Sequence, residues 1–426
     1  MDALELHTKW MILVFIIGYV CITIEHLIHV NKATTALLMG IICWVIQFLY
    51  GSTECGGALP CLQEHIAEIS QIVFFLIGAL AIVELISAHN GFAIIANAID
   101  FRSKRSLLWV VGLIAFFLSA ILDNLTTTIV MVTLIGKLID KGEDRLMLGG
   151  AVVIAANAGG AWTPIGDVTT TMLWVGGQIS TLNVMRHLFF PSVMTLVASF
   201  AVLSLMLKGS FKPKEVHLEG NKVEPRGKLI LFLGVACLVF VPIFKVLTGL
   251  PPFMGVLFGV GVLWLITDIL HRNHGDRDHL RIPSVMTKVD FSSILFFLGI
   301  LLAIDALDTA GVLKKLALSL DALFTHPAYL ATLIGLASAV VDNVPLVAAT
   351  MGMYTMTQYP VDDSFWQLIA YCAGTGGSIL IIGSAAGVVF MGLEKVNFIW
   401  YCKKISLAAL VGYFAGIALY LLNANL

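Results

Sequence analysis

Two aspartate–asparagine pairs are the residues of this sequence best suited to do chemistry, because each lies inside a long apolar stretch. The first pair is Asp123-Asn124 and the second is Asp342-Asn343. A carboxylate at the depth of a bilayer is costly unless it is paired, hydrated or bound to an ion, so it indicates a functional site. Two such carboxylates in matching surroundings, one in each half of the chain, indicate a transporter built from internal repeats.

Further oxygen-bearing side chains lie in two other apolar stretches, 146–177 and 366–392, which glycine and polar residues interrupt. Carboxylates, amides and hydroxyls together form sites for hard cations, whereas an anionic substrate needs a cationic partner. The set contains no lysine or arginine. The candidate cation- and proton-binding residues are Asp123, Asn124, Thr126, Asn157, Thr163, Asp167, Thr169, Asp342, Asn343, Thr375, Ser378 and Ser384.

Some of these residues have a structural alternative. Asn124 and Asn343 could cap the helix that follows each break, since asparagine is a good N-cap. A threonine such as Thr126 could bond back to a helix carbonyl. A cap alone would not require a buried charge twice, so we interpret Asp123 and Asp342 as functional.

The composition places the chain in a membrane. Of 426 residues, 59% are hydrophobic and 12% are charged, with a mean hydropathy of +0.95 and a net charge of −2. A soluble domain has about 25% charged residues, and no basic patch here indicates a nucleic-acid partner. Simple spans are expected at 10–30, 35–50, 69–88, 187–207, 228–246, 251–270, 291–308 and 398–422.

Four stretches do not fit a simple span. Residues 107–138 and 327–358 are too long for one crossing, and an Asp-Asn pair interrupts each near its middle. We interpret both as re-entrant helical hairpins, which a membrane tolerates where protein buries the broken backbone. We interpret 146–177 and 366–392 as broken transmembrane helices. The fold class is therefore an all-α polytopic membrane protein with two inverted repeats, each with a re-entrant hairpin and a broken transmembrane helix.

The repeats set the expected domains and topology. Residues 1–207 form the first repeat with its leading helix, 208–227 a mobile cytoplasmic linker, and 228–426 the second, inverted repeat. Five crossings in each half place most lysines and arginines on one side, which the positive-inside rule makes cytoplasmic. That side includes Lys32, Lys104, Arg145, Lys395 and Lys404, and the opposite side includes Lys9, Arg186, Lys245, Lys314 and Lys315.

The polar stretches resemble the NhaD-type sodium/proton antiporters of the ion transporter superfamily. The resemblance covers nearly the whole chain and rests on the segments SAILDNLTTT (119–128), NAGGAWTPIGD (157–167), VDNVPL (341–346) and GTGGS (374–378). It implies exchange of Na⁺ or Li⁺ for H⁺ by alternating access, with Asp123 and Asp342 as carboxylates that the cation and the proton share. It also implies Na⁺ ligands at Asp123, Asn124, Asn157, Asp342, Asn343 and Ser378.

The same resemblance implies a homodimer in lipid, a role in pH homeostasis and no cofactor. The location it suggests is a bacterial inner membrane, and the topology derived from the charges then places both termini in the periplasm. The dicarboxylate symporters of the superfamily carry Ser-Asn-Thr at the hairpin tips, whereas this sequence has aspartate in place of the serine, which favours a cation substrate. A Na⁺-coupled symporter of an anion and an intramembrane aspartyl hydrolase are the two alternatives.

Cys55 and Cys61 flank two glycines and a proline in an acidic loop. The expected topology places this loop outside, where disulfides form and persist, so we expect the two cysteines to be bridged. The other five cysteines lie in or beside apolar spans without metal-ligand spacing, and we interpret them as packing residues.

Overall fold

The computed structural model describes residues 6–51, 58–94, 103–207, 209, 224–272, 275–324 and 326–424. Within these ranges the regular elements are helices. Nine helices of the described part are long and apolar enough to cross a membrane, or ten if the bent helix pair Val312–Leu323 and Pro327–Ala337 is counted as one span. The chain is therefore an all-helical, multi-pass membrane protein, as the sequence predicts.

Residues 210–223, which the structure does not describe, divide the elements into two series. The first series is α1 (Leu6–Thr23), α2 (Glu25–Ile28), α3 (Lys32–Tyr50), α4 (Ala58–Ala88), α6 (Lys104–Leu122), α7 (Asn124–Leu138), α8 (Glu143–Gly160), α9 (Val168–Val175) and α10 (Thr181–Met206). The second series is α11 (Gly227–Thr248), α12 (Pro252–His271), η2 (Gly275–Leu280), α13 (Ile282–Met286), α14 (Phe291–Thr309), α15 (Val312–Leu323), α16 (Pro327–Ala337), α17 (Asn343–Met353), α18 (Ser364–Gly376), α19 (Ala385–Glu394), α20 (Phe398–Lys404) and α21 (Ser406–Ala424).

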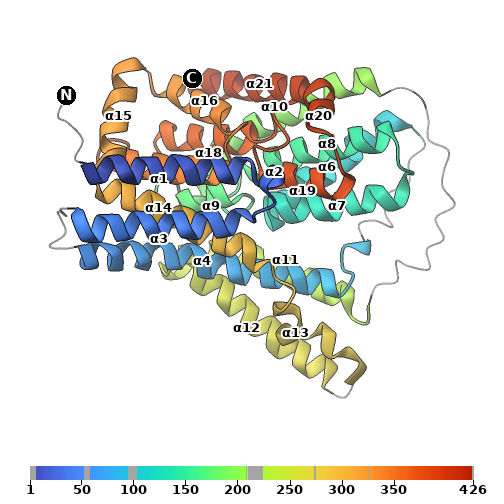
Figure 1. Ribbon diagram of the computed structural model, residues 1–426. Coiled ribbons are helices and arrows are strands. Elements are labelled where there is room, and N and C mark those ends of the chain that lie inside the picture. Colours follow the sequence, from blue (N-terminus) through green and yellow to red (C-terminus); the bar gives the residue numbers. More distant parts are fainter. Residues whose placement is uncertain are drawn as a thin grey trace.

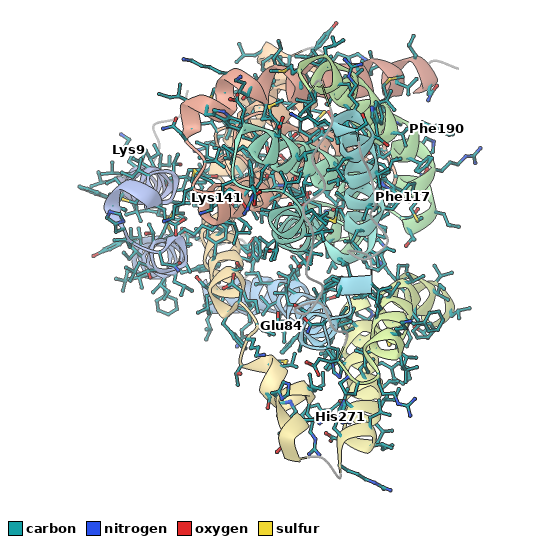
Figure 2. All side chains as sticks on the ribbon, turned by 90° about the vertical axis from the view of Figure 1, so that its right-hand side faces the viewer. Lys9, Glu84, Phe117, Lys141, Phe190 and His271 are labelled. Carbon is teal, nitrogen blue, oxygen red and sulfur yellow. The ribbon has the colours of Figure 1, made fainter. Side chains whose placement is uncertain are left out.

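The helices run mostly along one direction, and their outer surface is apolar. In Figure 1 the start of α1 and the end of α21 lie toward the same end of the molecule. Figure 2 looks along most of the helices, and Phe117 of α6 and Phe190 of α10 lie at its outer edge. Phe117 is 50% exposed and Phe190 is 61% exposed, as expected of side chains that face lipid tails.

The helices break at the four places where polar residues interrupt the apolar stretches. α6 ends at Leu122 and α7 begins at Asn124, so Asp123 alone separates them. Residues 338–342 separate α16 from α17. Residues 161–167 separate α8 from α9, and 377–384 separate α18 from α19. Each break frees backbone groups and side chains to meet in the protein interior.

In each half of the chain, a serine hydroxyl forms a hydrogen bond between the helix before the Asp-Asn pair and the broken helix. Ser119 of α6 donates through Oγ to the carbonyl oxygen of Ala156 of α8 at 2.6 Å. Ser338, just after α16, donates to the carbonyl oxygen of Ala373 of α18 at 2.8 Å. The two halves therefore repeat the contact that holds the helix before the Asp-Asn pair against the broken helix.

Glycines permit the close approach of the same helices. A Cβ atom added at Gly159 would lie 2.1 Å from the carbonyl oxygen of Phe116, and one added at Gly376 would lie 2.0 Å from that of Gly335. Real Cβ atoms do not approach backbone this closely. The GG motifs of the two broken helices are therefore packing surfaces, which explains why both halves carry them.

Some helix boundaries differ from the sequence prediction. The span expected at 10–30 divides into α1 and α2, and the span expected at 398–422 divides into α20 and α21. No helix was expected at α15, which buries Leu313 and Ala317 and exposes Lys314 and Lys315. Its apolar residues recur at helical spacing without forming a continuous run, so run length alone does not reveal it.

Two expectations fall partly outside the described residues. Most of the linker at 208–227 lies outside them, since 208 and 210–223 are not described. Cys61 is disulfide-bonded, whereas its expected partner, Cys55, lies outside the described residues.

Candidate functional site

Asp167 lies at the centre of a buried polar cluster, at the start of α9. It is only 1% exposed. Its Oδ1 accepts the backbone N–H of Thr169 at 3.0 Å, which caps the helix. Its Oδ2 accepts hydrogen bonds from Nδ2 of Asn124 at 2.9 Å and from Nδ2 of Asn343 at 3.4 Å. One carboxylate therefore contacts both asparagines of the repeated pairs.

The cluster extends from Asn124 across to the second broken helix. Asn124 Nδ2 also donates to Oδ1 of Asn157 at 3.0 Å. Asn157 Nδ2 donates to Oγ of Ser384 at 3.0 Å, and Ser384 Oγ accepts the N–H of Gly387 at 3.2 Å at the start of α19. These polar residues are buried. All four helix breaks thus contribute a side chain to one hydrogen-bonded network.

The two aspartates of the repeated pairs cap the helices that follow them. Asp123 accepts the backbone N–H of Thr126 at 2.7 Å and its hydroxyl at 3.0 Å. Asp342 accepts the N–H of Val344 at 3.4 Å. Capping by Asn124 and Asn343, the structural alternative that the sequence left open, does not occur, because the aspartates are the N-cap residues. The aspartates begin α7 and α17, and the asparagines that follow are turned toward Asp167.

Asp123 has an unusual backbone. Its φ is +93°, in the region that L-residues rarely adopt, and the energetic cost of such a residue is of order 1–3 kcal/mol. Strain of this kind persists where the surrounding structure fixes it, and it is common at functional sites. Here it lets α6 stop and α7 start within a single residue.

A cavity of about 60 Å³ adjoins this network. A water molecule needs at least about 10–15 Å³ of such space, so the cavity has room for a few waters or for one small ion. The polar residues that line it are Lys32, Asp123, Asn124, Asp167, Thr171, Ser293, Asp342 and Asn343. Three carboxylates and one ammonium group therefore surround a space of ionic size.

Lys32 lines the small cavity, although the sequence did not predict it to be part of the site. It was counted only with the basic residues of one membrane face. In the structure its Nζ lies 3.1 Å from Oδ2 of Asp342, 310 positions away in the chain. No local motif joins the two residues, so only the tertiary fold could reveal the pair.

A wider cavity of about 630 Å³ leads to the same ion pair. Lys32 and Asp342 line both this cavity and the small one. Glu25, His29 and Lys395 add charged or titratable groups to its wall. The Lys32–Asp342 pair is therefore common to the walls of the wide and the small cavity.

Another cavity, of about 310 Å³, has an acidic lining that includes Glu68, Asp305 and Asp308. His65 also lines it, and its Nδ1 lies 3.7 Å from Oδ1 of Asp305. None of the residues that line the small cavity lines this one.

Four of the residues proposed from the sequence have other partners. Thr126 bonds to Asp123 as described above. The hydroxyls of Thr163, Thr375 and Ser378 donate to the carbonyl oxygens of Ala120, Tyr371 and Thr375, respectively. Thr163, Thr375 and Ser378 are not among the residues that line the small cavity. The structure thus brings together the aspartates, the asparagines and Ser384, and leaves these three hydroxyls bound to backbone.

Comparisons with known proteins point to one family. Residues 10–374 match the citrate transporter family, CitMHS. Sodium/proton antiporter 1 of Arabidopsis thaliana is 54% identical over 98% of this chain and 72% of its own length. Sodium/proton antiporter 2 of the same plant is 51% identical over 97% of this chain and 99% of its own.

A bacterial relative is also named as a sodium/proton antiporter. The Na⁺/H⁺ antiporter NhaD of Alkalimonas amylolytica is 30% identical over 97% of this chain and 90% of its own. The solved structure of the Alcanivorax borkumensis YdaH transporter covers 91% of this chain and 95% of its own at 12% identity, with a TM-score of 0.49, too distant a likeness to support an argument. The chain is a transporter and not an enzyme, and it belongs to the NhaD-type sodium/proton antiporters within the citrate transporter family.

Proposed function

We propose that this protein exchanges Na⁺ for H⁺ across its membrane. The names of the plant and bacterial relatives support this function. The observation that carries it is the small cavity, in which Asp123, Asp167 and Asp342 meet Asn124 and Asn343. Carboxylate and amide oxygens are ligands for hard cations, and carboxylates also bind protons.

One site can then serve either ion, but not both at once. In the proposed cycle, ionised carboxylates hold Na⁺ on one side of the membrane and protons replace it on the other. Asp123 and Asp342 are the carboxylates that both ions share, and Asp167 is a third. Because the three lie around one cavity, their titration belongs to the site as a whole. The two ions supply the chemistry, and no cofactor is part of the proposal.

The proposed Na⁺ ligands are Asp123, Asn124, Asn157, Asp342, Asn343 and Ser378, and the contacts of Asp167 add it to that set. Support differs among them. Asp167 is supported by its contacts with both asparagines. Ser378 has less support, because its hydroxyl donates to a backbone carbonyl and it does not line the small cavity. Li⁺, with the same charge and a smaller radius, is proposed as a second substrate.

The proposed topology is that of two inverted repeats with re-entrant hairpins at α6–α7 and α16–α17. Ion pairs support it. Arg145 pairs with Glu394, Lys104 with Asp144 and Lys404 with Glu143. The first and third pairs join helix ends from the two halves, and the second joins two helix ends of the first half. The positive-inside rule assigns all of these helix ends to the cytoplasmic side. The wide cavity, which Lys32 and Lys395 line, would then open to the cytoplasm.

The topology has a direct test. In a variant whose free cysteines are replaced, a cysteine at Lys228 should react with an impermeant reagent only from the cytoplasmic side. A cysteine at Asn423 should react only from the opposite side. Both residues are exposed. Labelling of both from one face would contradict the inverted repeat.

The membrane and the assembly state are part of the proposal. The exchange requires a membrane that maintains a proton or sodium gradient, because the downhill movement of one ion drives the uphill movement of the other. A bacterial inner membrane with both termini in the periplasm is the predicted location, and the relatives come from plants as well as bacteria. The homodimer implied by the resemblance, and a role in pH homeostasis, are proposed on the same basis.

Symport of an anion such as citrate is the second candidate, since the family description is that of a citrate transporter. Two observations disfavour it. Three carboxylates line the small cavity and outnumber its one ammonium group, that of Lys32, so they would repel an anion. In addition, pockets for organic ligands have volumes of about 300–1,000 Å³, whereas this cavity has about 60 Å³.

Exchange in proteoliposomes tests the proposal. Purified protein should take up ²²Na⁺ when the vesicle interior is more acidic than the medium, and a protonophore should abolish the uptake. Asp123→Asn and Asp342→Asn should each remove it while the variants still insert. Citrate-dependent Na⁺ uptake without proton movement would favour the symporter, and wild-type exchange by both variants would contradict the proposed chemistry.

A further inference from the structure

We propose that the ammonium group of Lys32 is a tethered cation that occupies Asp342 when Na⁺ is absent and must be displaced for Na⁺ to bind there. This inference rests on the proposed function. It starts from the ion pair, whose Nζ–Oδ2 distance is 3.1 Å. The side chains are 20% and 12% exposed, so water screens the pair only partly.

The position of the pair suits a competitor. Lys32 and Asp342 line both the wide cavity and the small one. An ion that enters from the wide cavity therefore meets this pair before it reaches Asp167. A cation can use Asp342 only if it takes the place of the ammonium group, because both positive charges seek the same carboxylate.

Two other groups lie close enough to Lys32 to stabilise its ammonium group after it leaves Asp342. Its Nζ lies 4.3 Å from the ring centroid of Phe296, a distance at which a cation is attracted to an aromatic face. Glu25 accepts the backbone N–H of Lys32 through Oε1 at 3.2 Å, which places a second carboxylate beside the base of the lysine. These neighbours reduce the cost of displacing the ammonium group.

The pair also joins two parts of the fold. Lys32 is the first residue of α3, which packs against α1 and α14. Asp342 caps α17 and lines the small cavity. An unloaded site is therefore held to α3 by this contact, and Na⁺ binding releases it.

The test is equilibrium ²²Na⁺ binding to purified protein at one fixed alkaline pH. Lys32→Met keeps the aliphatic stem and removes the charge, so Na⁺ should bind more tightly, by about two- to fivefold, the upper part of the range expected from a partly exposed ion pair. Lys32→Arg keeps the charge and can hold both carboxylate oxygens, so it should bind Na⁺ more weakly than wild type. Lys395→Met removes a charge from the same wide cavity and should leave the affinity within about twofold, because charges separated by solvent are screened.

The outcomes separate this inference from the proposed function. If the wild-type protein binds no Na⁺, the proposed function is wrong and the role of Lys32 with it. If the wild type binds Na⁺ but Lys32→Met has the same or a weaker affinity, Lys32 is only a structural contact and the inference alone is overturned. Should Lys32→Met fail to fold, an unchanged or tighter affinity in Lys32→Arg overturns it equally.

Discussion

Replacement of Asp167 by asparagine should abolish tight Na⁺ binding while leaving the fold nearly as stable as before. The substitution preserves size and removes one charge. The carboxylate now accepts hydrogen bonds from Thr169, Asn124 and Asn343. A carboxamide has a single acceptor oxygen, so at least one of these buried donors would face an N–H group and lose its partner.

The effect on stability is the difference between two terms. An unsatisfied buried donor costs about 1–3 kcal/mol. Burying a charge whose partners are neutral amides costs several kcal/mol, and the substitution removes this desolvation cost. The gain offsets the loss of the hydrogen bond. We therefore expect the midpoint of thermal unfolding in detergent to shift by only a few degrees.

The effect on Na⁺ binding has no such compensation. One unit charge at about 4 Å from another, at an effective dielectric constant of about 20, contributes about 4 kcal/mol. That figure is an upper bound, because the carboxamide oxygen can still contact the ion, and it corresponds to about a thousandfold in Kd. We expect the loss in affinity to lie between about tenfold and about a thousandfold.

The matched control is Asp363→Asn. Asp363 also begins a helix, α18, where its Oδ1 accepts the N–H of Phe365 at 2.8 Å. It does not line the small cavity, and asparagine is an equally good cap. Both variants would be measured by ²²Na⁺ binding and by thermal unfolding. Wild-type Na⁺ affinity in Asp167→Asn, with folding intact, would refute the placement of the ion beside this carboxylate.

Three further predictions concern the scaffold and the ion pairs. Gly159→Ala and Gly376→Ala should each lower the free energy of unfolding by about 1–3 kcal/mol, because the new methyl groups meet backbone oxygens. Gly392→Ala, which meets nothing within 4 Å, should raise it by about 0.5–1 kcal/mol; equal effects at all three sites would contradict the close packing of the GG motifs. Arg145→Met leaves Glu394, which is only 5% exposed, without its partner and should cost about 3–5 kcal/mol. Adding Glu394→Met should restore most of that stability, and a double variant as unstable as the single one would show that the buried charge is not the cause. Thermal unfolding in detergent measures all of these variants.

The sequence predicts the interruptions of the helices well and the partners of the side chains poorly. Asp123 and Asp342 are visible as charges in apolar stretches, because such charges are rare. The GG motifs of the broken helices are visible because they recur with the same spacing in both halves. Each of these signals lies within a short segment of the chain, which is why a sequence can reveal it.

The contacts that organise the cluster are not local. Asp167 meets Asn343 across 176 positions, and Lys32 meets Asp342 across 310. Asp and Asn are both good helix caps, so the sequence could not decide which member of each pair would cap and which would turn inward. The fold determines which residue caps, because Asp123 directly precedes α7 and Asp342 directly precedes α17, and the residue just before a helix can reach the free N–H groups of its first turn.

Proton release on Na⁺ binding tests the central claim most directly. Isothermal titration of the purified protein with Na⁺, repeated in buffers of different ionisation enthalpy and across a range of pH, counts the protons that leave as the ion binds. If Na⁺ and H⁺ share the carboxylates of the small cavity, Na⁺ binding should release protons in a pH-dependent manner and the affinity should weaken as the pH falls. Both effects should become smaller when Asp123, Asp167 or Asp342 is replaced by asparagine. Na⁺ binding that releases no protons at any pH, with an affinity independent of pH, would contradict a shared site.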